Sequence, residues 1–206
     1  MKYTIITPTY GEHFKYVAQY LNSVAKYSLN SDNIIFVFIV EAQDVEGLKK
    51  ITKAYEALVS IHILQFEDLL ATYNVDISPN HLLIEYGKYS YQTLKKLYAM
   101  LYLPCQKFLV LDSESMWIRQ TDMERLFEDF FSDPFIAGSR ITPDKLGIIK
   151  KNVCQCTDYL LDFKSDKWFL ESFNWFYEKT ILLDLINELG TPIDLIKKAQ
   201  VAGKLQ

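Results

Sequence analysis

The sequence predicts an α/β fold in which a mostly parallel central sheet is flanked by helices. Four short apolar segments lack the strict alternation of half-exposed strands, which is typical of strands covered on both faces. Segments with helical periodicity separate them, and strand–helix–strand order at this spacing favours parallel pairing. The four predicted strands are Tyr3–Thr7, Ile34–Val40, Ile61–Phe66 and Lys107–Leu111.

Helices are expected between these strands because apolar residues recur there at helical spacing. In the first helix, Val17, Leu21 and Val24 share one face with Phe14. The three expected helices are His13–Tyr27, Val45–Leu58 and Tyr89–Leu103.

Further elements are expected after residue 120, where turn and capping residues separate apolar segments. No internal repeat or interdomain linker interrupts this part. The expected elements are a helix opened by the capping box Thr121–Glu124, a strand at 135–137, a loop or hairpin over 138–158, a long aromatic helix over 169–189 ending at Gly190, and a last helix opened by Thr191 and Pro192.

Composition narrows the class of protein. The chain has 206 residues, half of them apolar and 15% aromatic, which suffices for one sizeable core. A net charge of −4 offers no broad basic face, so we expect no nucleic-acid partner. Three cysteines and the lack of a signal-peptide pattern favour a reducing cytoplasm. No stretch reaches the roughly 20 apolar residues of a membrane span, and peripheral membrane contact stays open.

Polar residues follow three of the predicted strands. The first strand runs into the segment Thr7–Glu12, the second into Glu41, and the fourth into Asp112-Ser113-Glu114. Ligands of open parallel sheets bind beyond the carboxyl ends of the strands. These segments are therefore the candidate ligand site.

Asp112 and Glu114 are the candidate metal ligands. Residues i and i+2 of an extended segment point the same way, so the two carboxylates are expected to converge. A divalent cation would relieve their repulsion, and oxygen ligands suit Mg²⁺ or Mn²⁺. The alternative is a surface turn whose acidic residues only cap the next segment, because an isolated D-x-E pattern is common.

Three segments together resemble GT-A glycosyltransferases. "FLVLDSES" is similar to their D-x-D motif, with Glu in the last place. "YTIITPTYGEHFKYVAQYLNSV" resembles their opening strand and turn, and "YSYQTLKKLYAMLYLPCQKFLVLDSES" resembles the helix-then-motif segment of bacterial members. The likeness covers roughly residues 1–140.

The resemblance implies a nucleotide-diphospho-sugar transferase fold and a sugar-nucleotide donor. It implies that Asp112 and Glu114 hold a metal on the donor diphosphate and that Ser113 approaches the sugar or ribose. The residues expected to line the nucleoside are Pro8, Thr9, Tyr10 and Glu41. Lys95 and Lys96, on the helix before the motif, could reach the diphosphate, although exposed lysines are ordinary on an amphipathic helix.

Acceptor-side residues are expected after the motif. An inverting transferase needs a base within hydrogen-bond reach of the acceptor hydroxyl, and Asp158 and Glu178 are the preferred candidates. A retaining mechanism would not need one. Trp117 is a candidate for stacking on a sugar, and Arg140 for binding an anionic acceptor.

Two features depart from the family pattern. Many metal-dependent members have a late histidine ligand, whereas His13, His62 and His81 all precede the motif. The chain is also short for this fold, which leaves open a truncated C-terminus. We expect a single GT-A-like domain over 1–206, with a nucleotide-binding part at 1–120 and an acceptor-side part at 121–206.

The expected function is therefore a metal-dependent glycosyltransferase of bacterial surface polysaccharide or glycan assembly. A UDP-sugar is the favoured donor and a glycan or polysaccharide the acceptor. We expect a cytoplasmic location that could include the inner face of the membrane. The alternative is a non-catalytic nucleotide-sugar-binding or scaffolding module of a larger assembly protein. The sequence has no Walker, dinucleotide-binding or nucleophile-elbow motif.

Overall fold

A computed structural model describes residues 3–134, 139–140, 148–162, 164, 167–168 and 175–204. The chain divides into two units, one formed by residues 1–134 with 176–182 and the other by residues 135–175 with 183–206. No helix among the described residues is both long and apolar enough to cross a bilayer.

The first unit is built on a five-stranded sheet with strand order β4-β3-β1-β5-β9. The first four strands of this order are parallel, and β9 runs antiparallel to β5. The predicted mostly parallel α/β sheet is therefore confirmed. The strands are β1 (Tyr3–Pro8), β3 (Ile34–Val40), β4 (Ser60–Gln65), β5 (Lys107–Val110) and β9 (Phe176–Glu178).

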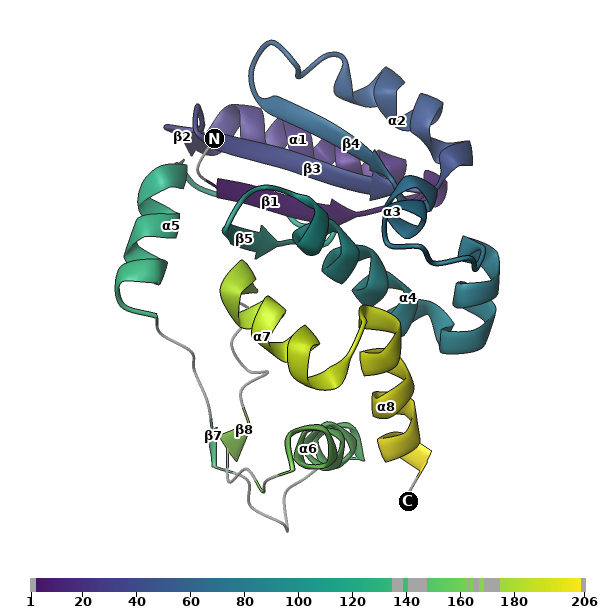
Figure 1. The fold of residues 1–206 in the computed structure, drawn as a ribbon. Coiled ribbons are helices and arrows are strands. Elements are labelled where there is room, and N and C mark those ends of the chain that lie inside the picture. Colours follow the sequence, from purple (N-terminus) through teal and green to yellow (C-terminus); the bar gives the residue numbers. More distant parts are fainter. Residues whose placement is uncertain are drawn as a thin grey trace. The chain divides into compact units, whose positions relative to one another are not determined.

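Helices cover both faces of this sheet, so β1 and β3 are buried along almost their whole length. On one face, α1 (Phe14–Tyr27), α2 (Val45–Thr52) and α5 (Met123–Ser132) contribute buried side chains to one hydrophobic cluster with β1 and β3. On the other face, α4 (Pro79–Tyr102) packs against β1 and β3, with α3 (Phe66–Thr72) beside it. Figure 1 shows α1 and α4 on opposite sides of the sheet.

Short elements complete this unit near the strand ends. The 3₁₀ turns η1 (Gly11–His13) and η2 (Ala42–Asp44) follow β1 and β3 and lead into α1 and α2. A separate two-stranded ribbon joins β2 (Ser28–Leu29) to β6 (Thr121–Asp122) in parallel. The polar loops after β1 and β3 are thus held as structured turns.

Two of the predicted helices have other bounds. α2 ends at Thr52 rather than Leu58. α4 begins at Pro79 rather than Tyr89, because Ser78 caps it by accepting a hydrogen bond from the His81 N–H, and proline suits the first helical position. Gly87, with φ 77° and ψ 166°, kinks this long helix and hides its continuity in the sequence pattern.

The cap of α5 also differs from the prediction. Asp122, not Thr121, is the capping residue, and its carboxylate accepts a 3.0 Å hydrogen bond from the Arg125 N–H. This bond and one from Asn30 lower the pKa of Asp122. Either residue type is a good cap, so the pattern alone could not choose between neighbours.

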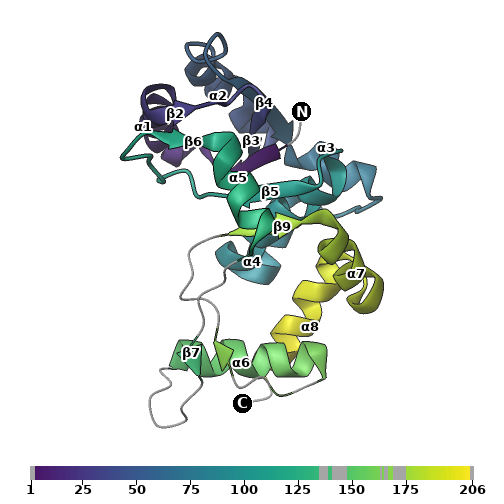
Figure 2. The same ribbon diagram turned by 90° about the vertical axis from the view of Figure 1, so that its left-hand side faces the viewer.

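The segment 176–178 is a strand, although a helix was predicted there. Phe176 stacks on Phe130 with a centroid distance of 4.2 Å and meets Phe127 edge to face. Bulky aromatic residues suit a half-buried strand at the edge of a sheet. Figure 2 shows β9 beside β5 in this position.

The second unit is helical where it is described. α6 (Ile148–Leu161) packs against α8 (Pro192–Lys204), so the loop or hairpin expected over 138–158 is wrong for its second half. A short antiparallel pair joins β7 (Ser139–Arg140) to β8 (Lys167–Trp168). α7 (Lys179–Leu189) starts in the first unit and continues into this one.

The start of α8 agrees with the prediction. Gly190 has φ +97° after α7, and Pro192 is the first residue of α8. Thr191 and Asp194 form a reciprocal capping pair, in which the Asp194 carboxylate accepts from the Thr191 N–H and hydroxyl. The strand expected at 135–137 lies outside the described residues.

Candidate functional site

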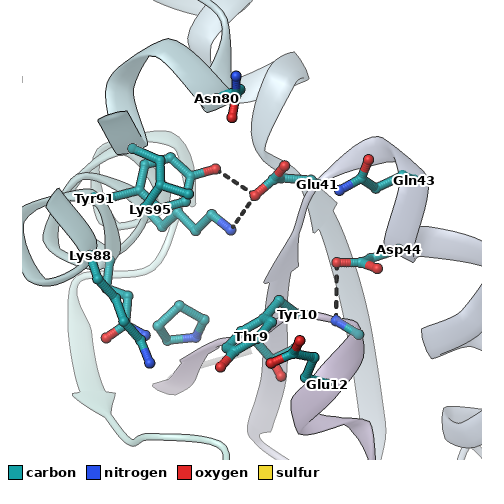
Figure 3. Close-up of a pocket in the computed structure, with 14 residues that line it drawn as sticks. Thr9, Tyr10, Glu12, Glu41, Gln43, Asp44, Asn80, Lys88, Tyr91 and Lys95 are labelled. Atoms are coloured by element: carbon teal, nitrogen blue, oxygen red, sulfur yellow. Dashed lines mark hydrogen bonds and ion pairs between the residues drawn. The ribbon is translucent and has the colours of Figure 1, made fainter. Parts of the chain in front are cut away.

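A cavity of about 510 Å³ opens at the carboxyl ends of β1 and β3. The two strands are parallel and in register, so the turns that follow them lie at the same edge of the sheet. Side chains of α4 close the opposite wall (Figure 3). The lining residues include Pro8, Thr9, Tyr10, Glu12, Glu41, Asp44, Lys88, Tyr91 and Lys95. All four residues expected to line the nucleoside are therefore brought together around this cavity.

Glu41 is held from α4 by two donors. The Tyr91 hydroxyl donates a 2.8 Å hydrogen bond to Glu41 Oε1, and the Lys95 Nζ lies 3.5 Å from the same oxygen. Figure 3 shows both interactions converging on this carboxylate. Lys95 is only 3% exposed, and its ammonium also lies 4.6 Å from the centre of the Tyr91 ring. The Lys95 ammonium is therefore directed at the Glu41 carboxylate and not at solvent.

Burial sets the protonation behaviour of this cluster. Loss of solvation lowers the pKa of Lys95, and the nearby Glu41 carboxylate partly offsets that effect. Burial and the hydrogen bond to Glu41 both raise the pKa of Tyr91. Tyr91 therefore remains a hydrogen-bond donor across the physiological range.

The turn after β1 is fixed to the turn after β3. The Gly11 N–H donates a 3.1 Å hydrogen bond to Asp44 Oδ2, and a Cβ at Gly11 would lie 3.0 Å from Oδ1 of the same residue. The Ala42 N–H similarly donates to Glu67 Oε2 at 3.0 Å. These contacts give the cavity a preformed wall.

Thr9 contributes a polar group without a partner. Its side chain is 3% exposed, and its Oγ1 has no hydrogen-bond partner among the described residues. A buried hydroxyl left unpaired costs free energy, about 1–3 kcal/mol on mutational scales. Because Thr9 lines the cavity, a bound ligand is a natural partner for it.

The Asp112–Glu114 motif lies beside this cavity, after β5, and it forms a turn. The Ser115 N–H donates to the Asp112 carbonyl at 3.0 Å, which closes the turn. The expectation that the motif continues the strand in extended form is therefore wrong. Asp112 is 62% exposed, and its Oδ1 lies 3.2 Å from the Lys96 Nζ. Of the two lysines expected near the diphosphate, Lys96 therefore lies at the motif, whereas Lys95 contacts Glu41.

His13 contacts the motif, although the sequence did not mark it. Its Nδ1 lies 3.0 Å from the buried Ser113 Oγ and 3.4 Å from Glu114 Oε2. Ser113 Oγ in turn donates to Glu114 Oε2 at 3.0 Å. The His13 ring also packs against the Tyr10 ring in a tilted arrangement, with a centroid distance of 4.2 Å. His13 therefore links the motif to the cavity wall.

The motif offers oxygen ligands of the kind that Mg²⁺ and Mn²⁺ prefer. Asp112 and Glu114 are 62% and 55% exposed, so their carboxylates are open to a cation. No group of three or more His, Cys, Asp or Glu side chains in the described part of the chain is arranged to hold a metal. The two carboxylates could hold a divalent cation only if substrate phosphate and water supplied its remaining ligands.

The structure does not bring the predicted acceptor-side residues of the first unit to the cavity. Glu178 pairs with Lys107 at the beginning of β5, whereas Asp112 follows the other end of that strand, so Glu178 is misplaced for a base. Trp117 packs against the hydrophobic core, and its backbone N–H donates to Ser23 Oγ at 3.0 Å. A stacking platform for sugar is not supported by that packing.

The two other predicted residues belong to the second unit. Asp158 lies on α6, not in the irregular segment that suggested it as a base. Arg140 lies on the short strand β7, and its side chain is outside the described residues. Their roles remain predictions.

Comparison with known proteins supports the fold. No family model and no curated protein matches the sequence. The structure of mouse xyloside xylosyltransferase 1 in its apo form matches with a TM-score of 0.50 at 11% identity, over 98% of this chain and 74% of that one. Residues 1–349 of TarS from S. aureus match with a TM-score of 0.49 at 16% identity, over 97% and 55%.

A mannosyltransferase from Pyrobaculum calidifontis, in complex with GDP-Man and Mn²⁺, matches with a TM-score of 0.40 at 14% identity, over 70% of this chain and 36% of that one. The chain spans about half the length of the TarS structure, at 55%. At these identities the likeness concerns the fold alone. The resemblance to GT-A glycosyltransferases is confirmed at that level.

Proposed function

We propose that the chain transfers a sugar from a nucleoside-diphosphate donor to a glycan or polysaccharide acceptor. The observation that carries the proposal is the preformed cavity between the ends of β1 and β3 and helix α4, directly beside the acidic turn after β5. A fold supports many functions, so the proposal depends on this site rather than on the fold.

The cavity has the size and lining of a nucleoside site. Its volume of about 510 Å³ lies within the usual range for small-ligand pockets. Tyr10 supplies an aromatic face, and Glu41 and Thr9 supply polar atoms for a base or ribose. A UDP-sugar remains the favoured donor.

The diphosphate is proposed to lie at the neighbouring turn. Asp112 and Glu114 would hold a Mn²⁺ or Mg²⁺ ion, which would neutralise negative charge on the departing nucleoside diphosphate. Ser113 was expected to approach the sugar or ribose, but it is buried and bonded to His13 and Glu114, so its proposed role is to fix the shape of the turn. Lys96 stands next to Asp112 and can donate to a phosphate oxygen.

For the acceptor side, the proposal names two candidate residues. Asp158 is kept as the candidate base of an inverting reaction, and Arg140 as a candidate contact to an anionic acceptor. The division into nucleotide-binding and acceptor-side parts, a role in surface polysaccharide assembly and association with a membrane face also remain predictions.

A non-catalytic nucleotide-sugar-binding module is the second candidate. It is favoured by the ligand set at the turn, because no group of three or more His, Cys, Asp or Glu side chains among the described residues is arranged to hold a metal. Such a module would bind the donor without breaking its glycosidic bond.

Calorimetric titration with UDP, GDP and CMP, each with and without Mn²⁺, tests the binding step. We expect one nucleotide to bind, and to bind more tightly with the metal. Release of the free nucleotide (UDP, GDP or CMP) from the matching nucleotide sugar then separates the transferase from the binding module. Failure of all three nucleotides to bind would overturn both candidates.

A further inference from the structure

We propose that Lys95 and Tyr91 are positioning residues that fix Glu41 as a hydrogen-bond acceptor for the nucleoside. The inference rests on the proposed function, since it assigns the cavity to the nucleoside part of the donor. Lys95 and Tyr91 lie on the same face of α4, one helical turn apart, and meet the residue that follows β3.

Both contacts from α4 go to the same carboxylate oxygen of Glu41. The Tyr91 hydroxyl, at 2.8 Å, and the Lys95 ammonium, at 3.5 Å, both contact Oε1. Among the described residues, the donors to Glu41 are thus gathered on one side of its carboxylate. The other oxygen is left for an N–H or hydroxyl group of a ligand in the cavity.

Lys95, Tyr91 and Glu41 differ in burial, as expected if the first two position the third for a ligand. Lys95 and Tyr91 are buried, and Glu41, with 21% of its side chain exposed, lines the cavity that they help to close. A buried ammonium is retained only where a carboxylate compensates it. A bridge that served stability alone would have no need to leave its carboxylate at a cavity surface.

A second group in the same cavity points to a ligand. The buried Thr9 Oγ1 has no hydrogen-bond partner among the described residues. With Glu41 as a fixed acceptor and Thr9 as an available donor, the wall offers both types of hydrogen bond. Nucleosides carry N–H, hydroxyl and carbonyl groups that match such a pair.

The arrangement predicts that nucleotide affinity falls at alkaline pH. The charged groups that face Lys95 are Glu41, Asp44 and Glu67, and Tyr91 faces it as a neutral donor. Burial lowers the pKa of Lys95, so its ammonium is lost earlier than that of an exposed lysine as pH rises. Glu41 then loses its ion pair and its fixed orientation.

The test is calorimetric affinity for UDP between pH 7 and pH 10, in the presence of Mn²⁺, for wild type, Lys95→Arg, Lys95→Met and Tyr91→Phe. We expect Lys95→Met to weaken binding at least tenfold at pH 7 and Tyr91→Phe about fivefold, as for hydrogen bonds to a charged group. Lys95→Arg should keep most of the affinity and lose less of it at high pH, because arginine stays charged.

Matched controls separate positioning from general damage. Lys49→Met removes an exposed lysine paired with Glu46, and Tyr98→Phe removes a buried hydroxyl from the same helix as Tyr91. Both should bind UDP as wild type does. Ionisation of the base affects every variant alike, so the difference between wild type and Lys95→Arg is the informative quantity.

Two outcomes would overturn the inference in different ways. If wild type binds UDP and Lys95→Met and Tyr91→Phe bind it equally well, the positioning role is wrong and the proposed function stands. If wild type binds none of UDP, GDP and CMP, the proposed function fails and the inference with it. Should Lys95→Met not fold, Tyr91→Phe and Lys95→Arg decide the question.

Discussion

Two acidic sites lie at the ends of strands that flank β1, and they differ in burial. Glu41 follows β3 and is held by the buried Lys95 and Tyr91. Asp112 follows β5 and has a side chain that is 62% exposed, and it pairs with Lys96, whose side chain is 18% exposed. The same chemistry, a carboxylate beside a lysine, therefore occurs in a closed environment and in an open one.

The difference indicates separate roles for the two sites. Interactions between charges are strong and geometrically fixed where water is excluded, and weak and exchangeable where it is not. Glu41 is thus suited to hold one shape before a ligand arrives. The turn at Asp112 is suited to exchange Lys96 for a cation or a phosphate when one binds.

The largest expected effect is on stability, from Glu41→Ala. Removing this carboxylate leaves Lys95 buried without its partner, and breaking a buried pair costs about 3 kcal/mol at the lower end of its range. The lower end applies because Lys95 can lose its proton, given the lowered pKa. Asp112→Ala should cost less than about 1 kcal/mol, as for an exposed pair.

Urea-induced unfolding of the two variants measures this contrast directly. Lys95→Met combined with Glu41→Ala provides the matched control, because it removes both charges and should recover part of the loss. Equal destabilisation by Glu41→Ala and Asp112→Ala would remove the basis of the comparison.

The kink in α4 shapes the wall of the cavity beside Glu41, and removing it is expected to have the next largest effect. Gly87 has φ 77° and ψ 166°, a conformation that is essentially restricted to glycine. No atom lies within 4 Å of a Cβ built there, so the cost of Gly87→Ala is conformational, about 2 kcal/mol. The segment before the kink carries Asn80 and Leu83 into the cavity wall.

Gly87→Ala should therefore lower both the unfolding free energy and the affinity for nucleotide, measured by urea unfolding and calorimetry. Thr93→Ala, at an exposed position on the same helix, is the control and should change stability by less than about 0.5 kcal/mol. Wild-type stability in Gly87→Ala would mean that the helix adopts another kink.

The sheet and the position of the cavity were predictable from local sequence. The strands β1 and β3 are buried on both faces, and the rule for parallel sheets directed attention to their carboxyl ends, where the cavity lies. The strand β9 was missed because a segment of three residues is too short to show the alternation of a strand. Its formation also depends on pairing with β5, which is distant in the sequence.

The detailed roles of side chains could not be read from spacing. Lys95 and Lys96 are adjacent, yet they point about 100° apart on the helix, so one meets Glu41 and the other meets Asp112. Choosing between them requires the rotation of α4 against the sheet. His13 lies 100 residues before Ser113 in the sequence. Only the position of η1, after β1 at the same sheet edge, brings its ring to Ser113.

A smaller effect is expected on ligand affinity from Asp112→Asn. The amide keeps the shape of the side chain but removes the charge that a divalent cation requires. We expect the affinity for the preferred nucleotide in Mn²⁺ to fall at least tenfold, about 1.4 kcal/mol, with little change without metal. Asp129→Asn, an exposed carboxylate on α5, is the control. Unchanged metal-dependent affinity in Asp112→Asn would remove this residue from the metal site.

The smallest effect is expected from Lys96→Met, and it has the opposite sign. The Lys96 ammonium, 3.2 Å from Asp112 Oδ1, competes with any cation for that carboxylate. Removing it should raise the affinity for Mn²⁺ alone about two- to fivefold, the equivalent of an exposed ion pair. Titration of Mn²⁺ by electron paramagnetic resonance, in the absence of nucleotide, measures it.

The same variant should bind nucleotide with Mn²⁺ less tightly, because Lys96 is then unable to donate to the diphosphate. A rise in metal affinity with a fall in nucleotide affinity would indicate that Lys96 exchanges one partner for the other. Lys49→Met, which removes an exposed lysine paired with Glu46 away from the motif, should change neither quantity. If Lys96→Met left the affinity for Mn²⁺ unchanged, the cation and Lys96 would not compete for Asp112. The proposed exchange of Lys96 for a cation at this turn would then be wrong.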